Sequence, residues 1–311
     1  MTVSVMIGIC TIILLFVMIM AGVHISIALA LSSLLGVLLI SGGKVNVALS
    51  ILSATAYSGI REYSFIVLPL FLMMGIFMSH SGSATALFTS SNYLLRRVPG
   101  GLGVATVASN ALFAAVTGVS VASAAVFSKV AMPEMVRYKY DKSFAVGTVS
   151  GSSVLGMLIP PSALMIIYGM QAEVSIGKLF LAGVGPGIVL ATIYSIYIIV
   201  RASMRPKLIG REVGPDGKAV KVDWSKERKE SLKKVILGPL PTILLIILVM
   251  GGIWGGFFTP YEAAAFGCLG SMIIALCTGM RWKGLKGVVL ETASSGASIM
   301  LLLIAATMYS R

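Results

Sequence analysis

Residues 151–169 read GSSVLGMLIPPSALMIIYG, and this stretch combines two features that conflict. It lies within thirty residues that carry no charge, 143–172, and a helix that crosses a bilayer needs about 20 apolar residues. Its middle, however, contains Pro160 and Pro161, and proline lacks the N–H donor of a helix and clashes with the preceding turn. The sequence therefore predicts a transmembrane helix that is broken near its centre.

A broken membrane helix has two interpretations. Lipid cannot satisfy the backbone groups that the break frees, so protein or a water-filled cavity must cover them. Secondary transporters place ion and substrate sites at such breaks, where unwound carbonyl groups bind the cation. The alternative is a proline kink beside a packing face of small residues, here Gly147 and Gly151. The stretch alone leaves both interpretations open.

The composition indicates an all-α polytopic membrane protein. The 311 residues are 57% hydrophobic and 11% charged, whereas soluble domains carry about 25% charged residues. The first apolar run has no Lys or Arg before it and no cleavage site after it, so we expect a retained span. Segments 45–60 and 84–95 are expected to form short helices in the interface or packed at an angle. The predicted spans are 3–20, 24–41, 63–80, 143–168, 179–200, 235–258, 263–280 and 292–310.

The charged residues and the cysteines argue against several functions. The net charge is +13, but the basic residues gather in loops, where they report topology and contact anionic lipid, so no nucleic-acid partner is expected. Cys10, Cys268 and Cys277 share no metal-ligand or redox spacing. No constellation of catalytic residues is present, so the chain is not expected to be an enzyme.

The charge of the loops predicts the orientation of the chain. The polar segment 201–234 holds eleven Lys or Arg residues against five acidic ones, which places it in the cytoplasm by the positive-inside rule. Counting spans back from this segment places Arg137, Lys139 and Lys142 on the cytoplasmic side as well. The pair Arg96-Arg97 is also expected there.

The uncharged run 98–128 therefore begins and ends on the same side of the membrane. It has 31 residues, whereas two full crossings need about 40. We predict a re-entrant hairpin that enters from the cytoplasm and returns, with a tight non-helical tip of small residues at 115–125. The alternative is that 98–128 crosses the membrane once and that one basic pair does not report the orientation of the chain.

The hairpin and the broken helix offer neutral oxygen atoms as ligands. Carbonyl and hydroxyl oxygens suit a monovalent cation such as sodium better than a transition metal. Proton-coupled carriers usually place a carboxylate or a histidine within the membrane, whereas the acids and histidines here lie near the ends of spans, which disfavours proton coupling. In the alternative interpretation these hydroxyls only bond back to the preceding helical turn. The hydroxyl residues are Thr117, Ser120 and Ser123 in the hairpin, and Thr148, Ser150, Ser152, Ser153 and Ser162 in the broken helix.

Two long stretches resemble a known family. GVSVASAAVFSKVAMPEMVRYKYDKSFAVGTVSGSSVLGMLIPPSALMIIYG (118–169) and GGIWGGFFTPYEAAAFGCLG (251–270) are similar to the large membrane subunit, DctM-like, of the tripartite ATP-independent periplasmic (TRAP) transporters. The resemblance implies an elevator-type, sodium-coupled permease of the bacterial inner membrane, with sodium as a transported ion and no resident cofactor. The implied partners are a small four-helix membrane subunit and a periplasmic binding protein that delivers an organic anion. Family substrates include C4-dicarboxylates, sialic acid, and other sugar and keto acids.

The resemblance also implies roles for individual residues. Pro161 and Ser162 would border the substrate path. Thr259, Pro260 and Glu262 are interpreted as a structural cap at the start of a span. At its tip the family hairpin reads Gly-Ser-Ser, whereas this chain has Val119 in the middle position. The implied sodium-binding residues are Gly118, Ser120, Ser123, Gly151, Ser152, Ser153, Gly156 and Pro160.

The family repeats its hairpin and broken helix in inverted form, and we expect this chain to hold the first repeat and only the start of the second. It is therefore expected to be truncated at its C-terminus relative to the family. The alternatives are a truncated remnant that does not transport and, less favoured, an ion channel. The expected division of the chain is 1–97 as scaffold helices, 98–176 as the transport-domain hairpin and broken helix, 177–234 as a span and the basic loop, and 235–311 as the start of the second repeat.

Overall fold

The computed structural model describes residues 3–61, 63–210 and 232–310. Every regular element within these ranges is a helix, which confirms the all-α prediction. Five helices are long and apolar enough to cross a membrane, or six if one bent pair forms a single span. The chain is therefore a polytopic α-helical membrane protein. Most of the predicted basic loop, 211–231, lies outside the described residues.

The chain forms two compact units, 1–65 with 293–311, and 66–292. In the first unit, α1 (Val3–Met20) packs on α2 (Ile25–Ile40), and α2 packs on α3 (Val45–Arg61). The C-terminal part of α16 (Trp282–Ser310) completes this unit, and the Ser33 hydroxyl donates a hydrogen bond to the Met308 carbonyl at 2.7 Å. At 16 residues α2 is about 24 Å long, slightly shorter than a typical span.

The second unit contains the predicted hairpin and broken helix. Residues 66–97 belong to the same compact unit as the hairpin. The expected functional division places these residues with the N-terminal scaffold instead, and that division stays a prediction. After the 3₁₀ turn η1 (Tyr63–Ile66), the helices are α4 (Val67–His80), α5 (Ser83–Leu95), α6 (Gly101–Thr117), α7 (Ser120–Arg137), α8 (Lys142–Ser153), α9 (Leu155–Leu158), α10 (Ala163–Gln171), α11 (Ile176–Met204), the 3₁₀ turn η2 (Pro206–Ile209), α12 (Leu232–Leu237), α13 (Leu240–Ile246), the π-helical turn η4 (Ile247–Gly251), α14 (Gly252–Trp254) and α15 (Pro260–Cys277).

The prediction of one span over 63–80 was wrong in its extent. The structure has a 3₁₀ turn followed by α4, which is only 14 residues long and meets α5 at a bend of 64°. The bend occurs because Gly82 adopts a left-handed conformation (φ 76°), which ends one helix and begins the next. Only α4 and α5 together satisfy the length and composition of a span.

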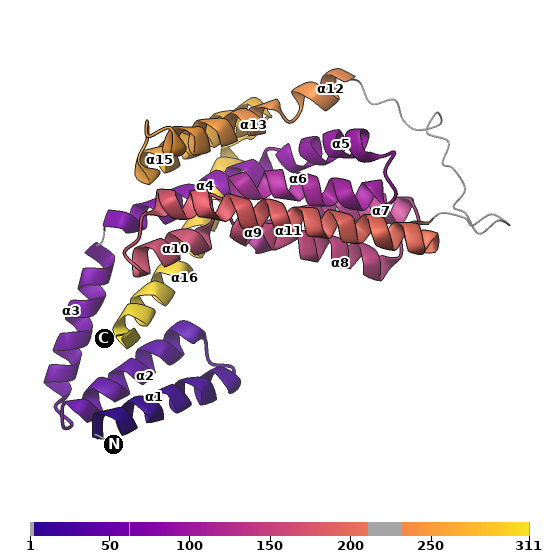
Figure 1. The fold of residues 1–311 in the computed structure, drawn as a ribbon. Coiled ribbons are helices and arrows are strands. Elements are labelled where there is room, and N and C mark those ends of the chain that lie inside the picture. Colours follow the sequence, from indigo (N-terminus) through magenta and orange to yellow (C-terminus); the bar gives the residue numbers. More distant parts are fainter. Residues whose placement is uncertain (1–2, 62, 211–231, 311) are drawn as a thin grey trace. The chain divides into compact units, whose positions relative to one another are not determined.

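Helix α6 forms the centre of the second unit. It contacts α4, α5, α7, α8, α9, α11 and α13, and 14 of its 17 residues are buried. Its Val104, Val107 and Ala114 pack in one apolar cluster with Leu155 of α9 and Ile198 of α11. In Figure 1, α5, α6, α7, α8 and α11 lie side by side around this core. A helix that is buried on nearly all sides can position the groups at its end rigidly.

Several predicted spans differ from the observed helices at their ends. Residues 232–254 form one apolar stretch with a π-helical turn, and α16 begins at Trp282, ten residues before the predicted start at 292.

Helix α15 begins at Pro260 because Thr259 and Glu262 form a capping box. The Thr259 backbone N–H donates to the Glu262 carboxylate at 2.8 Å, and the Glu262 N–H donates to the Thr259 hydroxyl at 3.3 Å. Thr259, Pro260 and Glu262 thus form the N-terminus of α15, as the predicted structural cap requires.

Candidate ion and substrate site

The proline pair breaks the predicted helix. Helix α9 ends at Leu158, Ile159 and Ser162 are extended (ψ 123° and 129°), and α10 begins at Ala163. The carbonyl groups of Ile159, Pro160 and Pro161 accept no hydrogen bond from any described residue. The break therefore supplies backbone oxygens that a helix would have used internally.

The uncharged run 98–128 forms a helical hairpin, as predicted. Helices α6 and α7 are joined by only two residues, Gly118 (φ 63°) and Val119 (φ −135°). The turn is much shorter than the expected non-helical tip at 115–125, because the alanines and serines around it fit helical backbone and only glycine readily takes the left-handed conformation. Phe113 and Phe127 pack edge to face at 5.7 Å and hold the two arms together.

The hairpin turn touches the helix break directly. The Ala163 N–H donates to the Gly118 carbonyl at 3.1 Å, and a Cβ atom on Gly118 would collide with the Pro161 carbonyl oxygen. A Cβ on Gly156 would lie 3.1 Å from the Ser120 nitrogen. On another side, a Cβ on Gly75 of α4 would lie 2.7 Å from the Thr117 carbonyl oxygen. The turn thus fits between α4, α9 and the break without space for larger residues.

The hydroxyl groups near this junction differ in their partners. No described residue hydrogen-bonds to the Ser120 hydroxyl, which lies directly after the turn. The buried Ser123 hydroxyl lies 3.2 Å from that of Thr117. Ser152 and Ser153 donate to the carbonyl groups of the preceding turn, as the alternative interpretation expected, yet a hydroxyl that donates keeps lone pairs that can bind a cation.

Pro161 and Ser162, the residues expected beside the substrate path, are buried in the break. The Ser162 hydroxyl donates to the Met157 carbonyl at 2.7 Å and accepts a long hydrogen bond from the Met165 N–H at 3.5 Å. In this structure Ser162 therefore connects α9 to α10 and caps α10. The role of Pro161 and Ser162 beside a substrate path stays a prediction.

Asn110 is a residue that the sequence interpretation missed. It is fully buried in α6, and its amide nitrogen donates to the Ser152 hydroxyl at 2.9 Å. Its amide oxygen is buried and finds no partner among the described residues, which is costly unless water or a cation lies beside it. The sequence could have indicated this residue, because Asn110 is the only amide side chain in the uncharged run 98–128.

Next to the broken helix, a cavity of about 580 Å³ lies between α6, α8 and α11. Gly151 and Ser152 line it together with Tyr194 and Arg201, and the Nε atom of Arg201 is buried without a hydrogen-bond partner. The sequence interpretation assigned Arg201 to the polar loop. Its spacing of seven residues from Tyr194 indicates instead that both lie on one face of α11.

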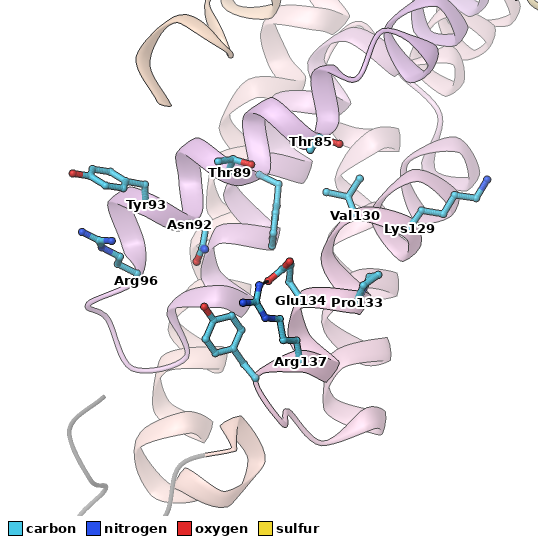
Figure 2. A pocket seen from close by; sticks show the side chains of 12 residues that line it. Thr85, Thr89, Asn92, Tyr93, Arg96, Lys129, Val130, Pro133, Glu134 and Arg137 are labelled. Carbon is cyan, nitrogen blue, oxygen red and sulfur yellow. Dashed lines mark hydrogen bonds and ion pairs between the residues drawn. The ribbon is translucent and has the colours of Figure 1, made fainter. Parts of the chain in front are cut away.

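The open end of the hairpin is basic. Arg96, which follows α5, and Arg137, at the end of α7, line one pocket, shown in Figure 2. Lys129, which directly follows the run 98–128, lines the same pocket as Arg96, which precedes the run, and this contradicts the alternative of a single span. How deep the hairpin turn lies in the bilayer stays a prediction.

A helical hairpin whose turn presses against a broken span, within a polytopic α-helical protein, is the architecture of secondary transporters. Residues 12–311 match the family described as the tripartite ATP-independent periplasmic transporter, DctM component. The chain therefore belongs to this family of TRAP large permeases, which are transport proteins.

Three relatives show the range of the family. The chain is 35% identical to the C4-dicarboxylate TRAP transporter large permease protein DctM of Pseudomonas aeruginosa, over 90% of this chain and 61% of that protein. It is 35% identical to the ectoine permease TeaC of Halomonas elongata, over 80% and 54% of the two chains. It is 27% identical to the sialic acid permease SiaM of Vibrio cholerae, over 93% and 64%. The chain thus spans roughly three fifths of the length of the curated relatives that it matches.

Proposed function

We propose that this chain supplies the hairpin and broken helix of a TRAP permease that takes up an organic anion with sodium. The observation that carries the proposal is the junction between the Gly118 turn and the Pro160-Pro161 break. Within the part of the chain that the structure describes, the carbonyl groups of this junction's break and the Ser120 hydroxyl have no hydrogen-bond partner, and no ionisable side chain is part of the junction. Neutral oxygens of this kind suit a monovalent hard cation.

The candidate sodium ligands lie in two places, at the junction itself and at the end of α8. Gly118, Ser120 and Pro160 come from the turn and the break, and Gly156 of α9 packs against Ser120. Ser123 lies one turn further along α7. Gly151, Ser152 and Ser153 lie in the last turn of α8, where Ser152 adds the hydrogen bond from Asn110. We add the Asn110 amide oxygen to this set, because it is a buried acceptor without a donor.

The substrate is proposed to be an organic anion, such as a C4-dicarboxylate, sialic acid, or another sugar or keto acid. Arg201 supports this class, because its guanidinium lines the cavity that also borders Gly151 and Ser152 and can pair with a carboxylate. Asp141 lines the same cavity, and its carboxylate accepts a hydrogen bond from the Phe144 N–H as the cap of α8. Pro161 and Ser162 are proposed to border the path. The periplasmic binding protein of such a system delivers the substrate and a small four-helix subunit braces the permease in the bacterial inner membrane. The mobile part is proposed to move as an elevator.

Transport by the complete complex tests the proposal. We expect uptake of the organic anion into proteoliposomes to require a sodium gradient and to stop when choline replaces sodium. Ser120→Ala should raise the sodium concentration needed for half-maximal uptake several-fold, because it removes a hydroxyl ligand. The matched control is Ser128→Ala, since Ser128 lies on the same helix but is exposed and bonds only to the Ala124 carbonyl. Uptake that continues unchanged in choline would exclude sodium coupling.

The rival functions give different results in the same vesicles. An elevator moves substrate in slow, saturable steps, whereas a channel would show single-channel conductance. A remnant that does not transport would show neither, even with both partners present. Saturable uptake that depends on sodium and on the binding protein supports the carrier.

A further inference from the structure

A second pocket, of about 330 Å³, lies at the basic end of the hairpin between α5 and α7 (Figure 2). On α5 its lining residues follow one helical face, from Thr85 through Thr89 and Asn92 to Arg96. On α7 the facing residues run from Lys129 to Arg137. The full lining is Thr85, Phe88, Thr89, Asn92, Tyr93, Arg96, Lys129, Val130, Pro133, Glu134, Arg137 and Tyr138.

The charge of this pocket is positive. It contains three basic residues, Arg96, Lys129 and Arg137, against the single acid Glu134. Glu134 and Arg137 form an ion pair at 3.5 Å, but their side chains are 40% and 65% exposed, and such pairs are weak in water. The guanidinium of Arg96 lies 4.4 Å from the centre of the Tyr93 ring, which orients it. In Figure 2, Arg137 lies in the middle of the pocket beside Glu134, and Arg96 and Lys129 extend at its two edges. The pocket therefore offers an anion these cations together with neutral donors such as Asn92 and Thr89.

The surroundings of the pocket are suited to a lipid. Leu94 on α5 and Val136 on α7 adjoin its basic end and are 75% and 48% exposed, as expected of side chains that face acyl chains. A further basic residue, Lys139, follows α7. Clusters of this kind beside membrane helices attract anionic headgroups.

We propose that this pocket binds the phosphodiester headgroup of an anionic phospholipid such as phosphatidylglycerol. A phosphodiester carries one negative charge, which the basic residues can match without neutralising Glu134. The glycerol hydroxyls of the headgroup can donate to the Glu134 carboxylate, which would repel the higher charge of free phosphate. Such a lipid would join α5 to α7 at the end of the hairpin opposite its turn. The proposal does not depend on sodium coupling or on the identity of the substrate.

The test is native mass spectrometry of the purified full chain in detergent micelles, titrated with phosphatidylglycerol or with phosphatidylcholine of the same acyl chains. We expect saturable binding of phosphatidylglycerol and at least tenfold weaker binding of phosphatidylcholine. Arg96→Gln and Arg137→Gln should each weaken the binding of phosphatidylglycerol about tenfold, because each removes a charge-assisted hydrogen bond. Arg97→Gln is the matched control, since Arg97 is adjacent but does not line the pocket, and it should bind as the wild type does.

A second variant separates binding from folding. Glu134→Gln keeps an oxygen that can accept from the glycerol hydroxyls and makes the pocket more positive, so it should tighten the binding of phosphatidylglycerol, which a folding defect would not do. Four results would overturn the proposal: equal binding of both lipids, an equal loss in Arg97→Gln, weaker binding in Glu134→Gln, or displacement of the lipid by inorganic phosphate at equal concentration. Displacement by succinate would also overturn it, by placing the pocket on the path of an organic anion.

Discussion

The two ends of one helical hairpin use opposite chemistry. At the turn, Gly118 and Ser120 present backbone and hydroxyl oxygens, are packed against a helix break, and have no charged neighbour in the junction. At the open end, the half-buried Arg96 and the exposed Arg137 line a pocket with charged side chains. Buried charge is costly and a neutral oxygen much less so, which explains why the closed end is neutral. The comparison indicates that the turn is suited to a small cation and the open end to an anion.

The strongest test of this difference changes the turn. Gly118→Ala should destabilise the protein by roughly 2–4 kcal/mol, because alanine strains at a positive φ and its Cβ would collide with the Pro161 carbonyl. Gly147→Ala is the control, since a Cβ there meets nothing within 4 Å and alanine favours a helix. Thermal unfolding in detergent, followed by fluorescence, compares the two. If both variants unfold at the wild-type temperature, the turn is not tightly packed.

A smaller effect on stability, one that depends on sodium, is expected at Asn110, which lies between the two ends of the hairpin. Asn110→Leu removes an amide oxygen that has no partner among the described residues, and it also removes the hydrogen bond to the Ser152 hydroxyl. Because Ser152 keeps its hydrogen bond to the Val149 carbonyl, stability in choline chloride should stay within about 1 kcal/mol of wild type. If that oxygen binds sodium, the rise in unfolding temperature on adding sodium should shrink in the variant.

The control for this experiment is Ser109→Ala. The Ser109 hydroxyl is also buried but donates only to carbonyl groups of its own helix, at 2.6 Å and 3.2 Å, so the response to sodium should be unchanged. A loss of stability in Asn110→Leu that is the same in sodium and in choline would assign Asn110 a purely structural role.

The smallest effect is expected at the open end. Glu134→Ala breaks an exposed ion pair with Arg137 and should change the free energy of unfolding by less than about 0.5 kcal/mol. The same thermal measurement, made without added lipid, checks this value. A loss comparable to that of Gly118→Ala would show that the two ends of the hairpin do not differ as described.

The sequence contained enough information to predict the main elements of the site. Pro160 and Pro161 predict the break because proline cannot continue a helix, and the matching charge at both ends of 98–128 predicts the hairpin. The bend at Gly82 was not predicted, because an isolated glycine is compatible with either a helix or a turn. The hydrogen bond from Asn110 to Ser152, and the position of Arg201 on the cavity that Ser152 also lines, required the structure as well, since they join helices that are far apart in the sequence.

Hydrogen exchange of the complete complex in sodium chloride and in choline chloride tests the cation site most directly. The Ala163 amide donates to the Gly118 carbonyl, so it reports on the contact between the turn and the break. If sodium binds at this junction, peptides that contain residues 117–120 and 159–163 should exchange more slowly in sodium, and Ser120→Ala should reduce this protection. Exchange at both segments that is identical in sodium and choline, at concentrations where sodium drives uptake, would contradict the account.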